Sequence, residues 1–140
     1  FTHLILPAMP KQVFINLPVR NLKRSVALYQ ALGFTINPQF SDETAHCMVW
    51  SEHIYVMLLS HEKFMTFATK PIADTQNGLA ALISLSFDDK AAVDAAMASG
   101  LEAGGKEPHE VRDYGFMYQR SLEDFDGHTW ELFYMDPSGL

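Results

Sequence analysis

The sequence predicts an α+β fold made of two copies of one βαβββ module. A β-like run at 13–19 has a counterpart at 82–87, and each run precedes a side chain able to cap a helix, Asn21 or Asp89. In both halves the capping residue lies two positions after the last residue of the run. Three further β-like runs follow each predicted helix. An order of elements that occurs twice indicates an internal repeat.

The first module begins with the run Val-Phe-Ile-Asn-Leu-Pro-Val, whose β-branched and apolar residues favour a strand. Asn21 can accept a hydrogen bond from a free backbone N–H and so begins a helix. Leu22, Val26 and Tyr29 recur at helical spacing, and Gly33 ends the helix because glycine tolerates the left-handed conformation. The remaining strands of this module are expected at 34–40, 45–50 and 54–60.

The second module repeats this order. After the strand at 82–87, Asp88 or Asp89 caps a helix that Gly104-Gly105 closes. The packed face of this helix is predicted to hold Val93, Ala96, Met97 and Gly100. Strands are expected at 106–111, 116–122 and 128–135, and the Asp126-Gly127 pair suits a tight hairpin between the last two.

These patterns divide the chain into four parts. Residues 9–61 are the first module, 62–78 a linking loop that contains Lys70-Pro71 and Asn77-Gly78, and 79–140 the second module. Residues 1–8 are apolar but lack a basic leader, and Pro7 interrupts them, so a secretory signal is not expected. We interpret them as a leader or an upstream remnant outside the fold. The two modules together form one domain.

Composition limits the function classes. The 140 residues are 48% apolar, and 10 basic against 17 acidic side chains give a net charge of −7. This balance argues against nucleic acid or an anionic membrane as a partner, because phosphate binding needs clustered Lys and Arg. The single cysteine, Cys47, cannot form an internal disulfide, which is consistent with a cytoplasmic location. No apolar run approaches the roughly 20 residues of a membrane helix.

Three stretches resemble the vicinal oxygen chelate superfamily, which includes glyoxalases, bleomycin resistance proteins and extradiol dioxygenases. They are Leu17-Pro-Val-Arg-Asn-Leu-Lys-Arg-Ser25 with Tyr29 and Leu32-Gly-Phe34, then Leu85-Ser-Phe-Asp-Asp89, and Asp124-Phe-Asp-Gly-His-Thr-Trp-Glu-Leu132. The match covers about 11–136 and is nearest to glyoxalase-like proteins without an assigned reaction. The resemblance implies that each module curls into a half-barrel. Two half-barrels then enclose a cup, within one chain or across a homodimer.

The resemblance also implies where a divalent metal would bind. Metalloenzymes of this superfamily take ligands from the first and last strands of each module. The matching positions here are Phe14, Met57, Leu82 and Glu131. A ring, a thioether and an isobutyl group cannot hold a hard cation. We therefore expect no metal and no other cofactor at this site.

Glu131 is the candidate catalytic residue. Its functional interpretation is a general base or hydrogen-bond acceptor in an apolar cup, and the slightly favoured alternative is a carboxylate satisfied by backbone N–H groups or an arginine. Strand alternation directs further side chains into the cup, and Trp50 would extend its apolar wall. The expected lining residues are Phe14, Asn16, Met57, Leu59, Leu82, Ser84, Gln119, Ser121 and Phe133.

The histidines and the cysteine show no catalytic or metal motif. His46, His53, His61 and His109 lack the spacing of a zinc site and are expected to be surface or structural residues, and His128 is expected to face solvent in the hairpin turn. If the strand of Met57 slips, His53 or His61 would lie near the mouth of the cup. Cys47 is expected to be an inert buried thiol.

Three function classes remain open. The favoured one is a metal-independent protein that binds a small, partly apolar molecule. The second is an enzyme of the lyase, isomerase or dioxygenase type, with Glu131 as a base or in a non-standard metal site. The third is an interaction module, for which Tyr114, Phe116 and Tyr118 would form an aromatic patch.

Overall fold

The computed structural model describes residues 10–139, and its first module is a four-stranded sheet covered by one helix. Its elements are β1 (Val13–Val19), α1 (Leu22–Leu32), β2 (Thr35–Asn37), β3 (Ala45–Val49) and β4 (Ile54–Ser60), in the sheet order β1-β4-β3-β2. Asn21 accepts a hydrogen bond from the backbone N–H of Arg24 at 3.1 Å and caps α1. Gly33 ends the helix with a φ of 116°, a left-handed conformation that favours glycine.

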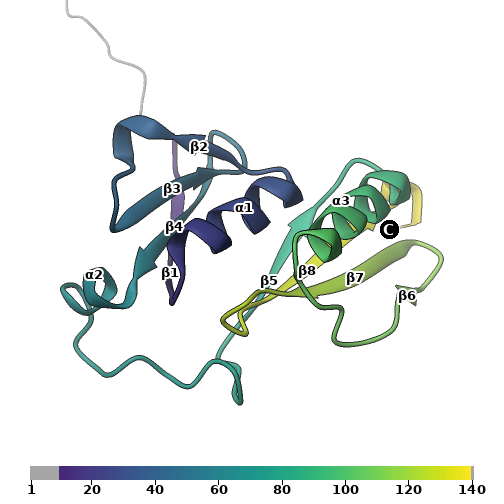
Figure 1. Cartoon of the computed structure of the whole chain (residues 1–140). Coiled ribbons are helices and arrows are strands. Elements are labelled where there is room, and N and C mark those ends of the chain that lie inside the picture. The colour runs from purple at the N-terminus through teal and green to yellow at the C-terminus, as the bar shows by residue number, and fades with distance from the viewer. Residues whose placement is uncertain (1–9, 140) are drawn as a thin grey trace, which may run out of the picture.

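The second module repeats this topology (Figure 1). Its elements are β5 (Leu82–Ser86), α3 (Lys90–Glu102), β6 (Arg112–Asp113), β7 (Met117–Glu123) and β8 (Thr129–Met135), in the order β5-β8-β7-β6. Asp89 caps α3 by accepting from the backbone N–H of Ala92 at 2.7 Å. In each module the first and last strands pair in parallel and lie at the same place in the sheet.

Each sheet has one face covered by a helix and one open face. In the first sheet, Val56, Leu58 and Met48 point toward α1 and are fully buried. Their alternate neighbours, such as Phe14 and Met57, point to the open face. The second sheet follows the same rule, with Trp130 and Leu132 on the helix side.

The two modules share one hydrophobic core. Helices α1 and α3 contact each other, and Figure 1 shows them along the join between the sheets. Gly100 of α3 makes this approach possible, because a Cβ added there would lie 2.8 Å from a methyl group of Leu32. Trp50 packs between Phe34 and Phe87, with ring centroids 5.0 and 5.1 Å apart. The expectation that Trp50 lines the cup is therefore wrong, because it follows the end of β3 and joins the modules.

The turn between β7 and β8 also holds the modules together. Tyr29 donates its hydroxyl hydrogen to Asp124 Oδ2 at 2.7 Å and accepts from Trp130 Nε1 at 2.8 Å. Burial raises the pKa of the Tyr29 hydroxyl well above its usual value and raises the pKa of Asp124 as well. His128 lies 2.9 Å from the Pro18 carbonyl and is half-buried. The expectation that His128 faces solvent is wrong, because β1 packs beside the turn.

Three further differences concern the less regular segments. The run at 34–40 is a strand only to Asn37, because Pro38 begins a short 3-10 helix (Pro38–Phe40). The run at 106–111 forms one isolated bridge, between Lys106 and Glu123, and β6 begins only at Arg112. The linking region is not all loop: it contains α2 (His61–Met65), which Ser60 caps.

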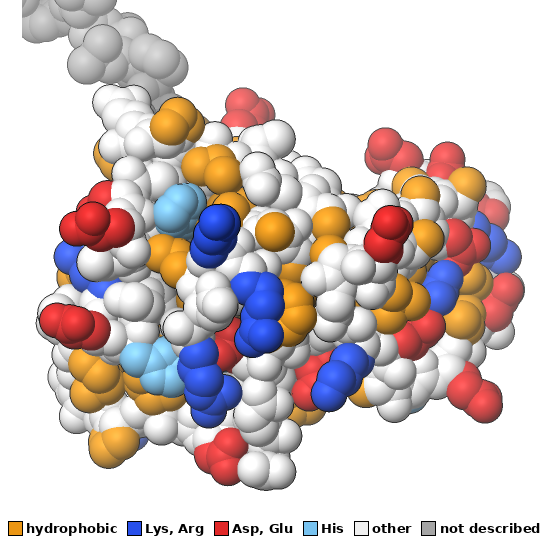
Figure 2. Space-filling model, in the orientation of Figure 1, with side chains coloured by type: hydrophobic (Ala, Val, Ile, Leu, Met, Phe, Trp, Pro, Cys, Tyr) orange, Lys and Arg blue, Asp and Glu red, His pale blue; other side chains and the backbone are white. Residues whose placement is uncertain are grey.

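The surface of the described residues carries charge of both signs. Figure 2 shows acidic and basic side chains distributed over one face, with apolar side chains between them. Within residues 10–139, no helix combines the length and hydropathy that spanning a membrane requires. The expected boundary at residue 9 and the leader at 1–8 lie outside the described residues.

Candidate functional site

The open face of the second sheet carries the candidate site. Strand register places Ser84, Glu131 and Ser121 side by side in one cross-strand row. Because register partners on one face of a sheet have adjacent side chains, this row is continuous and polar. Leu82 and Thr129 form the row on one side of it, and Phe133 and Gln119 the row on the other. All the residues expected to line the cup from the second module point to this face.

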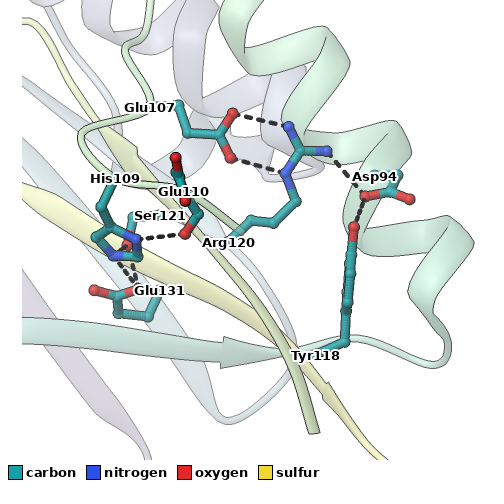
Figure 3. A network of polar contacts seen from close by, with 8 residues as sticks. All are labelled: Asp94, Glu107, His109, Glu110, Tyr118, Arg120, Ser121 and Glu131. Atoms are coloured by element: carbon teal, nitrogen blue, oxygen red, sulfur yellow. Dashed lines mark hydrogen bonds and ion pairs between the residues drawn. The ribbon is translucent and has the colours of Figure 1, made fainter. Parts of the chain in front are cut away.

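Glu131 lies at the centre of a hydrogen-bonded cluster (Figure 3). Only 4% of the residue is exposed. The Gln119 side-chain amide donates to Glu131 Oε2 at 2.9 Å, and the Ser121 hydroxyl donates to the same oxygen. Buried carboxylates need such partners, because an uncompensated charge in a protein interior is costly. Glu131 Oε1 accepts no hydrogen bond from residues 10–139 and points away from the cluster in Figure 3.

His109 completes this cluster from outside the sheet. Its Nε2 contacts the Ser121 hydroxyl oxygen and lies 3.7 Å from Glu131 Oε2. Its Nδ1 lies 2.8 Å from the backbone carbonyl oxygen of Glu110. The sequence predicted His109 only as a surface or structural residue, and it did not predict the contact with Ser121. Glu107 and His109 are two positions apart, which in a regular strand would place both side chains on one face of the sheet. The segment pairs with β7 only at Lys106, so strand alternation does not continue along it, and the two side chains reach opposite faces.

A second cluster on the helix-covered side anchors the same segment. Arg120 donates from Nε and Nη2 to the two carboxylate oxygens of Glu107, at 2.9 Å each, and from Nη1 to Asp94 at 2.9 Å. These bonds raise the pKa of Arg120, with Glu107 the principal cause. Tyr118 donates to the same Asp94 oxygen. Figure 3 shows Glu107 and His109 on one short segment, held by neighbouring residues of β7, Arg120 and Ser121.

A cavity of about 700 Å³ lies over the row of Leu82 and Thr129 and reaches the polar row at Glu131. Its volume is within the range of small-molecule sites, which are mostly apolar with a few placed polar groups. Leu79, Leu82 and Pro108 supply apolar surface, and Leu82 is 57% exposed. The ionisable side chains that line the cavity are those of His109, Arg112, Glu123 and Glu131.

The expected cup residues of the first module lie on a different open face. Phe14 stacks on Tyr55, with ring centroids 4.5 Å apart, and the Asn16 side chain donates to the Phe14 carbonyl at 3.4 Å. Met57 lies beside Asn16 in the sheet. A separate cavity of about 580 Å³ on this face is lined by Asn16, Leu59, Phe64, Phe67 and Ala68. The expected residues therefore form two groups, one on each sheet.

Comparison with known proteins agrees with this architecture. Residues 11–50 match the family model described as bleomycin resistance protein-like N-terminal. A glyoxalase/bleomycin resistance protein/dioxygenase family enzyme from Burkholderia phytofirmans PsJN superposes with a TM-score of 0.75 at 18% identity, covering 90% of this chain and 99% of that one. The chain therefore has the glyoxalase-like fold, and its residues 11–50 are similar to the N-terminal part of bleomycin resistance-like proteins.

Two further structures have the same fold. A hypothetical protein from S. aureus is 26% identical, with a TM-score of 0.74 and coverage of 91% of this chain and 95% of that one. A glyoxalase-related enzyme from Fulvimarina pelagi is 16% identical, with a TM-score of 0.73 and coverage of 89% and 88%. Among curated proteins, none matches the sequence of this chain.

The residues present do not fit the divalent metal of the superfamily. Of the four positions, Phe14, Met57 and Leu82 offer an aromatic ring, a thioether and an alkyl group, and only Glu131 offers an oxygen. The chain also places Phe14 and Met57 on one sheet and Leu82 and Glu131 on the other. Across residues 10–139, no three His, Cys, Asp or Glu side chains are grouped so that they could hold a metal ion.

The remaining candidates lie apart from the site. Cys47 is buried in β3, and burial raises the pKa of its thiol, which disfavours the reactive thiolate. His53 lies near the exposed Glu52, with 3.2 Å between Nε2 and Oε1. Tyr114 and Phe116 are exposed, whereas Tyr118 is half-buried over α3, so the three aromatic residues do not share one surface.

Proposed function

We propose that this chain is a member of the vicinal oxygen chelate superfamily that binds a small, partly apolar molecule at the open face of the second sheet, without a divalent metal. The observation that carries the proposal is the cavity of about 700 Å³ that joins exposed apolar surface to the Glu131 cluster. Glu131 Oε1 supplies a free acceptor, and Leu82 lies diagonally across the sheet from it. A ligand with an apolar body and a hydrogen-bond donor matches this arrangement. The cytoplasmic location is part of the same proposal and rests on the unpaired Cys47.

We further propose that the cup is completed across a homodimer. Within one chain each open face forms half a cup, and both halves expose apolar side chains: Phe14 is 47% exposed and Leu82 57%. If the first sheet of one copy covered the second sheet of another, both faces would be buried. Removal of this apolar surface from water would favour such an association.

The binding proposal is tested with a panel of small aromatic and antibiotic molecules, observed by chemical-shift changes in protein treated with a metal chelator. We expect a bound compound to shift signals of Glu131, Leu82 and Thr129. Glu131→Gln should weaken its binding at least tenfold, while Glu102→Gln, an exposed carboxylate at the end of α3, should not. No compound bound across the panel, or binding that requires an added metal, would contradict the proposal.

An enzymatic function is the second candidate, and the contact of Glu131 with Ser121 and His109 favours it. A carboxylate held by two hydrogen-bond donors, with one oxygen free, is suited to general-base chemistry of the lyase or isomerase type. A non-standard metal site would have only His109 and Glu131 as close ligands. Turnover that is lost in Glu131→Gln and is insensitive to chelation would support the base role. Turnover unchanged in that variant would exclude both versions.

A further inference from the structure

We propose that the ligand of the second sheet is a monoanionic acid, whose carboxylate pairs with Arg112. This inference rests on the proposed function, because it names the chemical class of the molecule that the cavity of about 700 Å³ would bind. The carboxylate is a third recognition feature of the ligand, beside its apolar body and its hydrogen-bond donor.

Strand register places Arg112 on the open face of the second sheet. Arg112 of β6 is the cross-strand partner of Gln119 in β7, and Gln119 donates on the open face to Glu131 Oε2 at 2.9 Å. Register partners have side chains on the same face of a sheet. The next residue, Asp113, pairs with Lys90 of α3 at 3.4 Å, so it points to the helix-covered face. Arg112 accordingly lines the cavity.

The Arg112 guanidinium group has no partner among residues 10–139. Its side chain makes no hydrogen bond and no ion pair there, unlike those of the other three arginines. Arg20 and Arg120 form ion pairs within the chain, and Arg24 lies over an aromatic ring. A cation that lines a cavity without a protein partner is available to an anion from outside the chain.

The acidic side chains of the cavity lie too far away to take up Arg112. Glu123 is four residues along β7 from Gln119, the register partner of Arg112, which corresponds to about 13 Å. Glu131 lies two strand spacings from Arg112, about 10 Å across the sheet. Its Oε2 already accepts from Gln119 and Ser121.

Three features of the ligand would follow one another across the sheet. Leu82 on the edge strand β5 exposes apolar surface, and Glu131 on the adjacent β8 has its free acceptor, Oε1. Arg112 lies on β6, the opposite edge strand. A molecule that crosses these strands would place its apolar body over Leu82, its donor at Glu131 and its anionic group at Arg112.

The chemistry of the guanidinium group favours a carboxylate with a single charge. Its N–H donors form a planar fork that matches two oxygens of one carboxylate or phosphate. One arginine balances one negative charge, and the net charge of the chain is −7, so a dianion would meet more repulsion than a monoanion. Arginine stays protonated in proteins, so the charge of Arg112 does not depend on pH.

Acids and their own amides provide the test. Chelator-treated protein is titrated with 2-hydroxyoctanoate, 3-hydroxyoctanoate and 3-phenyllactate, each beside its primary amide, while the Nε–H signal of Arg112 and the backbone signals of Leu82 and Thr129 are followed. We expect at least one acid to bind about tenfold more tightly than its amide and to shift the Arg112 signal. Equal affinity of every acid and its amide, or no acid bound, would overturn the proposal.

Variants of Arg112 separate the charge from the fork. Arg112→Gln should weaken binding of the acid about tenfold and change binding of the amide by less than about twofold. Arg112→Lys keeps the charge without the fork and should lie between the two. Lys23→Gln is the matched control for charge, because Lys23 is exposed on α1 and does not line this cavity. Equal losses in Arg112→Gln and Lys23→Gln would overturn the pairing with Arg112.

Two further comparisons fix the ligand class. Octyl phosphate carries close to two negative charges at pH 7 and should bind more weakly than the acids; tighter binding would overturn the monoanion in favour of a phosphate. If neutral compounds of the aromatic and antibiotic panel bind and the acids do not, the carboxylate is wrong and the proposed function stands. If neither set binds, the proposed function itself is wrong.

Discussion

Tyr29 joins two buried polar groups that lie far along the chain from it. Its hydroxyl donates to Asp124 and accepts from Trp130. Tyr29→Phe would remove the partner of the Trp130 N–H and of Asp124 Oδ2 in the core, although Asp124 Oδ1 keeps its two backbone donors, so we expect a loss of about 1–3 kcal/mol in the free energy of unfolding, measured with denaturant. Tyr55→Phe is the control, because its hydroxyl bonds are exposed, and it should change stability by less than about 0.5 kcal/mol. Equal losses of stability in Tyr29→Phe and Tyr55→Phe would mean that the buried hydrogen bonds of Tyr29 stabilise the protein no more than exposed ones do.

Asp124 should give the protein a distinct dependence of stability on pH. Burial raises the pKa of its carboxyl in the folded state above the ordinary value of 3.8. The folded protein therefore keeps this proton over a pH range in which the unfolded chain has lost it. The stabilisation from Asp124 is complete below the unfolded pKa and is lost as the pH rises through the folded one. The stability of Asp124→Asn relative to the natural chain should thus rise with pH from about 4 upward. A constant or falling difference would contradict this.

Single residues also show what strand alternation can and cannot predict. Glu131, Ser121 and Gln119 lie on one face because side chains alternate along β7 and β8, and that rule needs only the sequence. His109 reaches the same cavity from an irregular segment, and Arg112 from the two-residue strand β6. Irregular backbone has no fixed period, and β6 is too short to show one, so the sequence placed neither of them. Strand alternation would put Glu107 and His109 on the same face, so it could not predict that only His109 turns toward the cavity.

The segment at 106–110 has almost no regular secondary structure, and side chains on both faces of β7 fix its position. We expect Arg120→Met, which breaks the fork to Glu107, to reduce stability by about 1–3 kcal/mol, since both side chains are largely enclosed. It should also speed amide hydrogen exchange at Lys106 and displace His109. Lys90→Met is the control: its ion pair with Asp113 is half-exposed, and its loss should cost less than about 1 kcal/mol. Unchanged exchange at Lys106 in Arg120→Met would show that the fork does not hold the segment.

Helix α3 depends on one glycine at its contact with α1. In Gly100→Ala the new methyl group would lie 2.8 Å from Leu32 and 3.2 Å from Leu122, both buried. The cost of overpacking exceeds the gain in helix propensity, so we expect a net loss of about 1 kcal/mol. Ser99→Ala, exposed on the same helix, should be neutral or slightly stabilising, and thermal unfolding of the pair gives the comparison. If Gly100→Ala were more stable than the natural chain, α1 and α3 would have to move apart at little energetic cost to make room for the methyl group.

Elements with strong periodicity were predictable, and short ones were not. The caps Asn21 and Asp89 mark α1 and α3 because a capping side chain directly precedes a regular apolar pattern. Helix α2 is shorter than the window in which periodicity can be detected, although its cap, Ser60, is a typical one. The run at 106–111, Lys-Glu-Pro-His-Glu-Val, contains one β-branched residue and a proline, and it pairs only at Lys106. Pairing partners, which decide whether a run becomes a strand, are not visible in the run itself.

At the scale of the whole molecule, the repeat made the fold predictable. Each module must bury one face of its sheet under a helix, and a second identical order confirms the assignment of the first. How the two modules meet depends on particular contacts, such as Trp50 between Phe34 and Phe87. Those contacts join the helix-covered sides, and within residues 10–139 the open faces are only partly covered, with Phe14 47% and Leu82 57% exposed. The sequence could not decide between a cup in one chain and a cup across two.

The homodimer proposal gives the last prediction. If each open face covers that of a second copy, light scattering after size exclusion should give twice the 15.8 kDa mass of the chain. Leu82→Glu would place a charge in the middle of the covered apolar surface and should shift the population to monomer, because burial of an unpaired carboxylate is costly. Phe40→Glu introduces the same charge at an exposed apolar residue of the 3-10 helix Pro38–Phe40, which lines neither cavity, and serves as the control for added charge. Since Ser121 and Glu131 contact each other within one chain, the monomeric variant should keep their hydrogen bond but bind ligand more weakly. A monomer at all concentrations, with ligand binding unaffected by Leu82→Glu, would mean that one open face suffices.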